Sequence, residues 1–184
     1  MISTGPRSPV SFAVHVARLP EKGLPVSFAA DEESRAALAR DHDLEEVRAF
    51  SFDLLVTRWK KDGVKVTGKV TADIVQLCVV TLEPLENRVE AKIEALFVPE
   101  GSSLARPYDP SGEILVDAEG EDAPEPFSGD SVDVGAVAEE HFELAIDPYP
   151  RKPDARLPRD VEPQPEDKPN PFARLAALKD GGKQ

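Results

Sequence analysis

The chain has 184 residues, a formal net charge of −13 and 40% apolar residues, which fits one domain of ordinary size with tails. No apolar run approaches the roughly 20 residues that cross a bilayer. The N-terminus lacks a basic start followed by an apolar stretch, so no secretory signal is indicated. The single cysteine, Cys78, excludes an internal disulfide and a zinc cage made of cysteines. We therefore expect a cytoplasmic protein without a membrane partner.

The charge imbalance lies in one quarter of the chain. Residues 100–147 hold 14 acidic groups and one arginine, whereas the other residues hold 21 acidic and 21 basic groups. An acidic block repels phosphate backbones and favours basic partners. The alternative is a solvated loop that only aids solubility.

The N-terminal third predicts two short strands and a helix. Apolar and polar residues alternate over 11–17 and again over 24–28, where Pro25 implies an edge strand or a strand start. Asp31 has the character of an N-cap for a short helix over about 32–40, which has glutamates in its first turn and arginines later.

Three successive antiparallel strands are predicted over residues 50–98. The first two are joined at Asp62-Gly63, a hairpin pair in which glycine accepts a positive φ. Gly68 interrupts the alternation of the second strand and predicts a bulge or bend. The third strand covers 89–97. The prediction is a meander, the most strongly patterned part of the chain.

Beyond residue 99 the alternation is lost, and the composition predicts a mobile acidic loop over about 100–130. An apolar stripe then predicts a helix near 131–146, with Ser131 or Asp133 as its cap and Pro148 as its stop. Residues 148–184 form a proline-rich tail.

The tail ends in a short amphipathic helix at 170–179, which either docks on its own domain or acts as a tethered ligand. The fold class expected is α+β: an antiparallel sheet of about five or six strands with the 131–146 helix packed on it. We expect one domain over 10–147, with the tail outside it.

Cys78 is the first candidate for chemistry. A catalytic thiol needs a depressed pKa and a base within reach. The apolar neighbours Leu77, Val79 and Val80 are expected to raise the pKa of this thiol instead. We therefore favour a buried structural thiol, with a partner-contacting role and a cysteine-dependent enzyme as the alternatives.

Other site patterns are weak. The three histidines, His15, His42 and His141, lack the spacing of a metal pair. The sequence has no phosphate-cradling loop, nucleophile elbow or dinucleotide fingerprint. A small-ligand carrier remains an alternative, although no polar constellation supports a small-molecule substrate. No cofactor and no metal are expected.

A small basic cluster is the candidate for direct nucleic-acid contact. Arg58, Lys60 and Lys61 surround Trp59 at the predicted hairpin. Basic residues interleaved with aromatic ones are typical of RNA-binding surfaces. A solvated hairpin tip is the alternative.

Three segments are informative together: Val70-Thr-Ala-Asp-Ile-Val-Gln-Leu-Cys-Val-Val-Thr-Leu-Glu-Pro-Leu85, the stretch 132–153 around Glu139-Glu-His-Phe-Glu143, and Asn170-Pro-Phe-Ala-Arg-Leu-Ala-Ala-Leu-Lys179. In combination they resemble the bacterial YceD family of large ribosomal RNA subunit accumulation proteins. The resemblance implies a non-enzymatic role in accumulating 23S ribosomal RNA, with a ribosomal protein or a precursor of the large subunit as partner. Direct contact with the RNA is the alternative.

The chain departs from that family at one point. Many members have Cys-x-x-Cys where this chain has Cys78-Val-Val-Thr81. Because threonine cannot replace a thiolate on zinc, a metal role of the pair does not transfer to this chain. We therefore expect the segment to serve folding or partner contact. The candidate partner-binding residues are Gln76, Cys78, Thr81, Glu83, Pro84, Arg58, Lys60 and Lys61.

Overall fold

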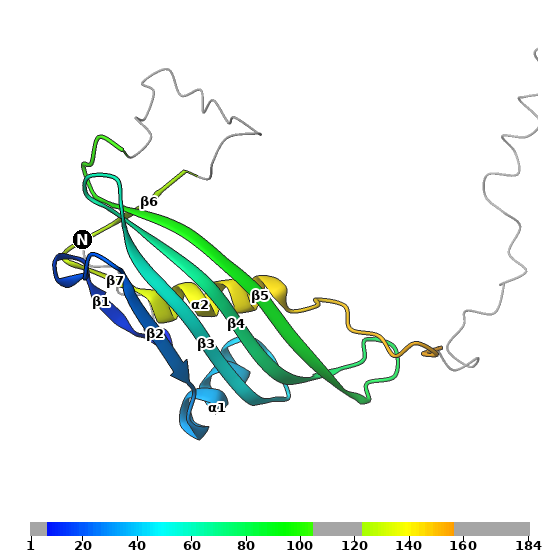
Figure 1. Ribbon diagram of the computed structural model, residues 1–184. Helices are drawn as coiled ribbons and strands as arrows, with labels where there is room; N and C mark the ends of the chain where they lie inside the picture. Colours follow the sequence, from blue (N-terminus) through cyan, green and yellow to red (C-terminus); the bar gives the residue numbers. More distant parts are fainter. Residues whose placement is uncertain (1–6, 105–122, 157–184) are drawn as a thin grey trace, which may run out of the picture.

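The computed structural model describes residues 7–104 and 123–156. Its main element is a five-stranded sheet with the strand order β2-β3-β4-β5-β6 (Figure 1). A separate two-stranded pair joins β1 to β7. The α+β class and the strand number are confirmed. The strands are β1 (Ala13–His15), β2 (Leu24–Ala29), β3 (Glu46–Trp59), β4 (Gly63–Leu77), β5 (Pro84–Pro99), β6 (Glu125–Phe127) and β7 (Ser131–Asp133).

The predicted meander is confirmed as β3, β4 and β5. The β3–β4 register runs from Glu46↔Val75 to Trp59↔Gly63. The β4–β5 register runs from Val64↔Phe97 to Leu77↔Pro84. All three strands are longer than the alternation indicated, because pairing with a long neighbour extends a strand beyond its apolar pattern.

Two strand predictions were wrong in detail. The stretch 11–17 forms only the short β1, continues as a 3-10 helix over Val16–Arg18, and pairs with β7 outside the main sheet. The prediction of a purely antiparallel sheet and of a loop over 100–130 missed β6, which pairs parallel to the end of β5. Pro126 at the centre of this three-residue strand hid it, because proline is a weak strand signal.

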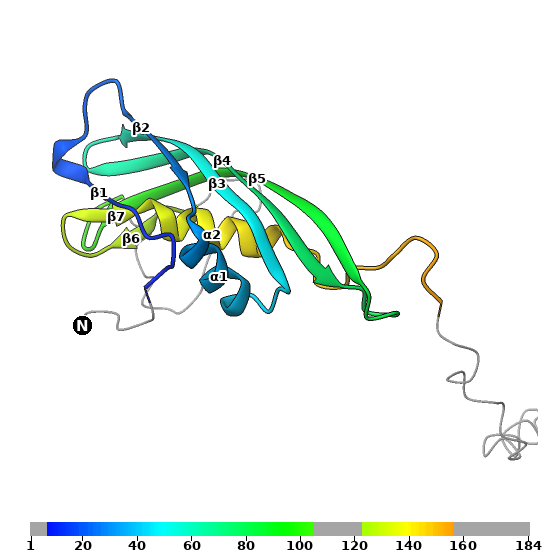
Figure 2. The same cartoon turned by 90° about the horizontal axis from the view of Figure 1, so that it is seen from below.

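The core lies between one face of the sheet and two helices. Helix α2 (Val134–Ala145) packs across β4 and β5 (Figure 2). Its buried residues include Val137, Ala138 and Phe142. The Phe142 ring stands edge-on to Phe50, with 5.3 Å between the ring centroids. The predicted N-cap is confirmed, since the carboxylate of Asp133 accepts from the first free backbone N–H groups of the helix.

Helix α1 (Glu32–Asp41) begins at Asp31, whose carboxylate accepts from the backbone N–H of Ser34, as the sequence predicted. The helix follows β2 and packs beside β3. Leu38 is its fully buried contact with the core. The chain then returns along the sheet as β3.

The opposite face of the sheet is solvated. Three ion pairs cross from β4 to β5 on this face: Lys65–Glu94, Lys69–Glu90 and Asp73–Arg88. Each partner is at least one third exposed, so these pairs contribute little to stability individually. Their effect is to leave the face without a strong net charge.

Two glycine interpretations need correction. The positive φ of the β3–β4 hairpin falls on Lys60, at 53°, and not on Gly63. Gly63 is needed for space, because a Cβ there would lie 2.7 Å from the Trp59 ring. The register runs unbroken through Gly68, and the irregularity lies between Val47 and Ala49. A Cβ at Gly68 would overlap the carbonyl oxygen of Asp53, so close backbone approach explains this glycine.

The stretch 105–122, which covers most of the predicted acidic loop, and the predicted helix at 170–179 lie outside the described residues. Among the residues that are described, no helix is long and apolar enough to cross a membrane.

Candidate functional site

The connection between β4 and β5, residues 78–83, is called here the Cys78 turn. The backbone N–H of Leu82 donates to the carbonyl of Cys78 at 2.8 Å, and the N–H of Cys78 donates to the carbonyl of Glu83 at 2.9 Å. Leu82 adopts a φ of 57°, in the left-handed region. The turn is therefore a defined, hydrogen-bonded structure that directs successive backbone N–H groups toward its first residue.

Cys78 is completely buried inside this turn, as the structural interpretation predicted. The pKa of its thiol is lowered to about 6 by the Thr81 hydroxyl, followed by the backbone N–H of Lys152, with smaller contributions from the N–H groups of Thr81 and Val80. The prediction that apolar neighbours would raise this pKa was wrong. The hydrogen bonds outweigh the desolvation, because a thiolate is stabilised by N–H donors directed at it.

A second segment, residues 146–152, is bound to the turn. The Val79 N–H donates to the carbonyl of Pro150 at 2.9 Å, and Lys152 Nζ donates to Glu83 at 2.7 Å. At the end of β4, Gln76 Nε2 donates to the carbonyl of Asp147 in the same segment at 2.9 Å. The structure thus brings together four of the predicted site residues, which are Gln76, Cys78, Thr81 and Glu83. Pro84 begins β5 next to them and is exposed.

Within this arrangement the polar groups serve one another. Gln76 is buried, and its side-chain oxygen accepts from Asn87 Nδ2 at 2.9 Å. The Thr81 hydroxyl lies 3.2 Å from Glu83. Lys152 lowers the pKa of the Glu83 carboxyl, and the Thr81 hydrogen bond adds to that effect. These side chains hold the turn and the 146–152 segment in one geometry.

Large apolar side chains of the turn, of the 146–152 segment and of the helix end that precedes this segment are exposed. Leu82 is 71% exposed, Tyr149 is 73% exposed and Leu144, on the last turn of α2, is 77% exposed. Val79 and Leu77 are exposed to a smaller degree. Sequence reasoning missed this surface. The available signal was Val79-Val-Thr-Leu82, an apolar run placed in a turn, where no strand face could bury it.

An acidic cavity adjoins the same end of the molecule. It has a volume of about 370 Å³ and is lined by Asp41, His42, Asp43, Leu44, Gln76, Glu143, Ile146, Asp147 and Pro148. The lining residues from the described part of the chain include four carboxylates and neither lysine nor arginine. This cavity is electrostatically suited to cationic groups.

Beside this cavity, His42 and Glu139 form a largely buried pair. The His42 Nε2 atom lies 3.1 Å from Glu139 Oε1, and the His42 ring packs edge-on against Phe142. The hydrogen bond to Glu139 raises the pKa of His42. Although desolvation opposes it, the pKa of the Glu139 carboxyl is lowered by its hydrogen bonds to His42 and Ser8. The pair fixes the end of α1 against α2.

The predicted basic cluster lies at the other end of β4. The Arg58 guanidinium lies 3.3 Å and 3.2 Å from the carbonyl oxygens of Ala17 and Leu19. Lys60 Nζ lies 4.2 Å from the centroid of the Trp59 ring. Lys61 lines a cavity of about 280 Å³. The structure does not bring this cluster together with the Cys78 turn.

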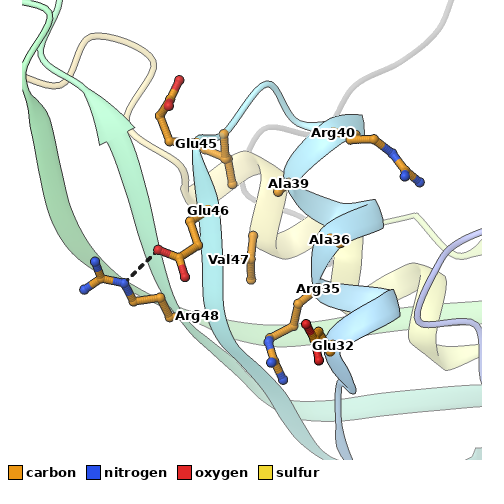
Figure 3. A pocket seen from close by; sticks show the side chains of 10 residues that line it. Glu32, Arg35, Ala36, Ala39, Arg40, Glu45, Glu46, Val47 and Arg48 are labelled. Carbon is orange, nitrogen blue, oxygen red and sulfur yellow. Dashed lines mark hydrogen bonds and ion pairs between the residues drawn. The ribbon is translucent and has the colours of Figure 1, made fainter.

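A further cavity, of about 440 Å³, lies between α1 and the start of β3 (Figure 3). Its charged lining consists of three arginines and three glutamates. Arg48 pairs with Glu46 at 3.0 Å and with Glu86 at 2.6 Å, and Arg35 donates to the Ala30 carbonyl at 3.0 Å. Balanced, internally bonded charges give this cavity no preference for one class of ligand.

No metal centre is found in residues 7–104 and 123–156, where groups of three or more His, Cys, Asp or Glu side chains with suitable geometry are lacking. His15 faces Asp130 at 3.3 Å, and the ring of His141 contacts the carbonyl of Val137 at 2.9 Å. Both histidines thus have local partners.

Comparison with protein families gives one match. A family model described as large ribosomal RNA subunit accumulation protein YceD matches residues 66–179, more than half of the chain. The chain belongs to the YceD family. The matched region contains the Cys78 turn, β5, α2 and the 146–152 segment. No curated protein and no solved structure matches. Family membership supports a role in the accumulation of large-subunit ribosomal RNA.

Proposed function

We propose that this protein is a non-enzymatic factor for the accumulation of 23S ribosomal RNA, and that it acts by binding a ribosomal protein or a precursor of the large subunit. The observation that carries the proposal is the family match over residues 66–179. Because large-subunit assembly takes place in the bacterial cytoplasm, the proposal places the protein there.

A protein partner is favoured over direct binding to RNA. The net charge of −13 opposes approach to phosphate. Of the predicted RNA-contacting residues, Arg58 is bonded to two carbonyl oxygens and Lys60 packs on Trp59. Ribosomal proteins are rich in lysine and arginine, and they offer the charge that complements this chain.

A cysteine-dependent enzyme is the second candidate, favoured by the lowered pKa of Cys78. That function requires the thiolate to reach a substrate, and the side chain is completely buried. We therefore assign the lowered pKa to stabilisation of the turn.

The proposal is tested by deleting the gene and measuring the ratio of 23S to 16S RNA together with the amount of assembled large subunit. A lowered ratio that is restored by the wild-type gene is expected. An unchanged ratio, with no ribosomal component recovered on the tagged protein, would reject the proposal.

The RNA-binding alternative has its own test. Charge reversal at Arg58, Lys60 and Lys61 is compared with the wild-type protein in gel shifts with precursor RNA. Binding that is present in the wild type and lost in the variant would favour direct RNA contact over the protein partner.

A further inference from the structure

Leu82 combines two features that the folding of this chain does not explain. It adopts a φ of 57°, a region that favours glycine and asparagine and that strains a leucine. Its side chain is nevertheless 71% exposed and contributes little to the core. Neither core packing nor the geometry of the turn favours an exposed leucine at this position, so the residue indicates a function.

Tyr149 lies on the segment that is hydrogen-bonded to the same turn. The next residue, Pro150, accepts a hydrogen bond from Val79 in the Cys78 turn, at 2.9 Å. The backbone N–H of Tyr149 donates to the carboxylate of Asp147 at 2.9 Å, which fixes the entry of the segment. Leucine and tyrosine side chains that protrude from a rigid backbone lose little conformational entropy when they are buried by a partner.

Acidic side chains border these apolar residues. The cavity lined by Asp41, Asp43, Glu143 and Asp147 ends at Pro148, which directly precedes Tyr149. Lys152 is neutralised by Glu83, whereas Arg151 is exposed. An apolar centre with an acidic border is complementary to an apolar patch that is flanked by lysine and arginine.

We propose that Val79, Leu82, Leu144 and Tyr149, bordered by the acidic cavity, form the docking surface for a lysine- and arginine-rich protein. Leu82 is the central apolar contact, and the carboxylates take up the flanking cations. The proposal rests on the proposed function and names the surface through which it operates. RNA is a poorer occupant, because an aliphatic side chain offers no stacking plane and the carboxylates repel phosphate.

The proposed surface also explains the role of the polar contacts between the turn and the 146–152 segment. The Lys152 N–H donor to Cys78, the Glu83–Lys152 pair and the Val79–Pro150 hydrogen bond join the turn to the 146–152 segment, and the Gln76–Asp147 contact joins the end of β4 to the same segment. Without them, Leu82 and Tyr149 would be carried by two independent segments. The polar residues are therefore positioning residues, and the exposed apolar residues make the contact.

The test uses the full-length tagged protein with Tyr149→p-benzoylphenylalanine, crosslinked in living cells and mapped by mass spectrometry. The expected product is a covalent link to a lysine- and arginine-rich protein of the large subunit, at a peptide that contains both apolar and basic residues. Links to RNA, or to a partner surface without basic residues, would overturn the proposal.

Matched variants then measure the contribution of the surface. Leu82→Asn is expected to reduce partner recovery by about tenfold or more, because it removes a central contact, while the melting temperature stays equal or rises. Asp41→Lys with Glu143→Lys is expected to reduce recovery as well and to leave the fold intact, since both residues lie in the last turn of a helix, where a cation is favourable.

Leu55→Thr is the control, because Leu55 is 40% exposed on the solvated face of the sheet and is expected to leave recovery unchanged. Equal recovery by the wild type and Leu82→Asn would overturn the docking surface while leaving the proposed function standing. If the wild-type protein recovers no ribosomal component, the proposed function fails and the surface fails with it.

Discussion

The two turns at the ends of β4 have the same backbone peculiarity and opposite surroundings. Lys60 in the β3–β4 turn has a φ of 53°, and Leu82 in the β4–β5 turn has a φ of 57°. The Lys60 ammonium is 4.2 Å from the Trp59 ring, and neighbouring Arg58 is bonded to backbone carbonyls. Leu82 is exposed, as are Val79 in the same turn and Tyr149 on the 146–152 segment that is bonded to this turn.

The difference shows how strain can be interpreted. At Lys60, contacts within the chain account for the side chain and offset part of the backbone cost. At Leu82, no comparable side-chain contact within residues 7–104 and 123–156 offsets the cost of the left-handed backbone. A residue of the second kind is a better indicator of a binding surface than a charged cluster, which the chain can use internally.

Strand β4 holds both turns in place, so a substitution at its centre is expected to have the largest effect on stability. Gly68→Ala places a Cβ on the carbonyl oxygen of Asp53 and forces β3 away from β4. We expect a loss of about 2–4 kcal/mol in the free energy of unfolding, measured by urea denaturation.

Gly129→Ala is the control for that variant. Gly129 has a φ of 82°, but no atom of the described part of the chain lies within 4 Å of an added Cβ, so only the backbone cost of about 1–2 kcal/mol is expected. If the two variants are equally destabilised, the close approach of β3 and β4 is not what requires glycine at position 68.

His42→Ala is expected to lower the free energy of unfolding by about 1.5–3 kcal/mol, because it removes the hydrogen bond between His42 and the carboxylate of Glu139. Folding raises the pKa of His42 from 6.5. The contribution of His42 to the free energy of unfolding is therefore complete below pH 6.5 and is lost as the pH rises through the folded-state pKa. The pKa of Glu139 is lowered from 4.5, so its contribution is lost only at lower pH.

The difference in stability between wild type and His42→Ala should therefore be largest between about pH 4.5 and 6.5. Melting curves recorded across this range and up to about pH 8 provide the measurement. A difference that grows above neutral pH would contradict the pairing with Glu139.

Cys78→Ser is expected to show the opposite pH dependence. The pKa of the Cys78 thiol is lowered from 9.0 to about 6, so its contribution is complete above pH 9.0 and is lost as the pH falls through about 6. The melting temperature of the wild type, relative to the variant, should rise between these values. The ultraviolet absorbance of the thiolate, titrated in the folded protein, gives the pKa directly.

The same variant also separates a structural thiol from a catalytic one. A melting temperature that falls while 23S RNA levels remain near normal would fit a thiol that stabilises the turn. Loss of function without any loss of stability would instead support the cysteine-dependent enzyme.

The smallest effect is expected from exchanging the strained residues themselves. Leu82→Asn should raise the free energy of unfolding by about 0.5–1 kcal/mol, since asparagine tolerates the left-handed region and little packing is lost. Lys60→Asn should be close to neutral, because a similar backbone gain is offset by the lost contact with Trp59. If the two variants change stability alike, the distinction between the turns disappears.

The sequence predicted the parts of the fold that repeat a local pattern. The meander and the caps at Asp31 and Asp133 follow from alternation and from side-chain chemistry within a few residues. The sequence did not predict β6, which depends on a neighbour strand distant in the chain. Nor did it locate the positive φ at Lys60, because the length of the turn decides which residue takes it.

The site shows the same limit. Cys78 was predicted as buried, but the predicted direction of its pKa shift was wrong, because the fold of the turn brings the Thr81 hydroxyl to the thiol and Lys152, far along the chain, adds an N–H donor. The joining of Gln76 to Asp147 was equally invisible in the sequence. The partner-binding residues as a group stay a prediction, which the crosslinking experiment addresses.

The paired charges on the solvated face of the sheet have a kinetic consequence. Since Lys65, Lys69 and Arg88 each face a carboxylate across β4 and β5, that face generates little field at a distance. The acidic cavity is lined by four carboxylates and, within the described residues, by His42 as the one side chain that can carry a positive charge, so its charges are only partly compensated. The field of this end would therefore steer a cationic partner toward the acidic cavity before contact. The association rate should fall steeply with ionic strength, while the dissociation rate changes little.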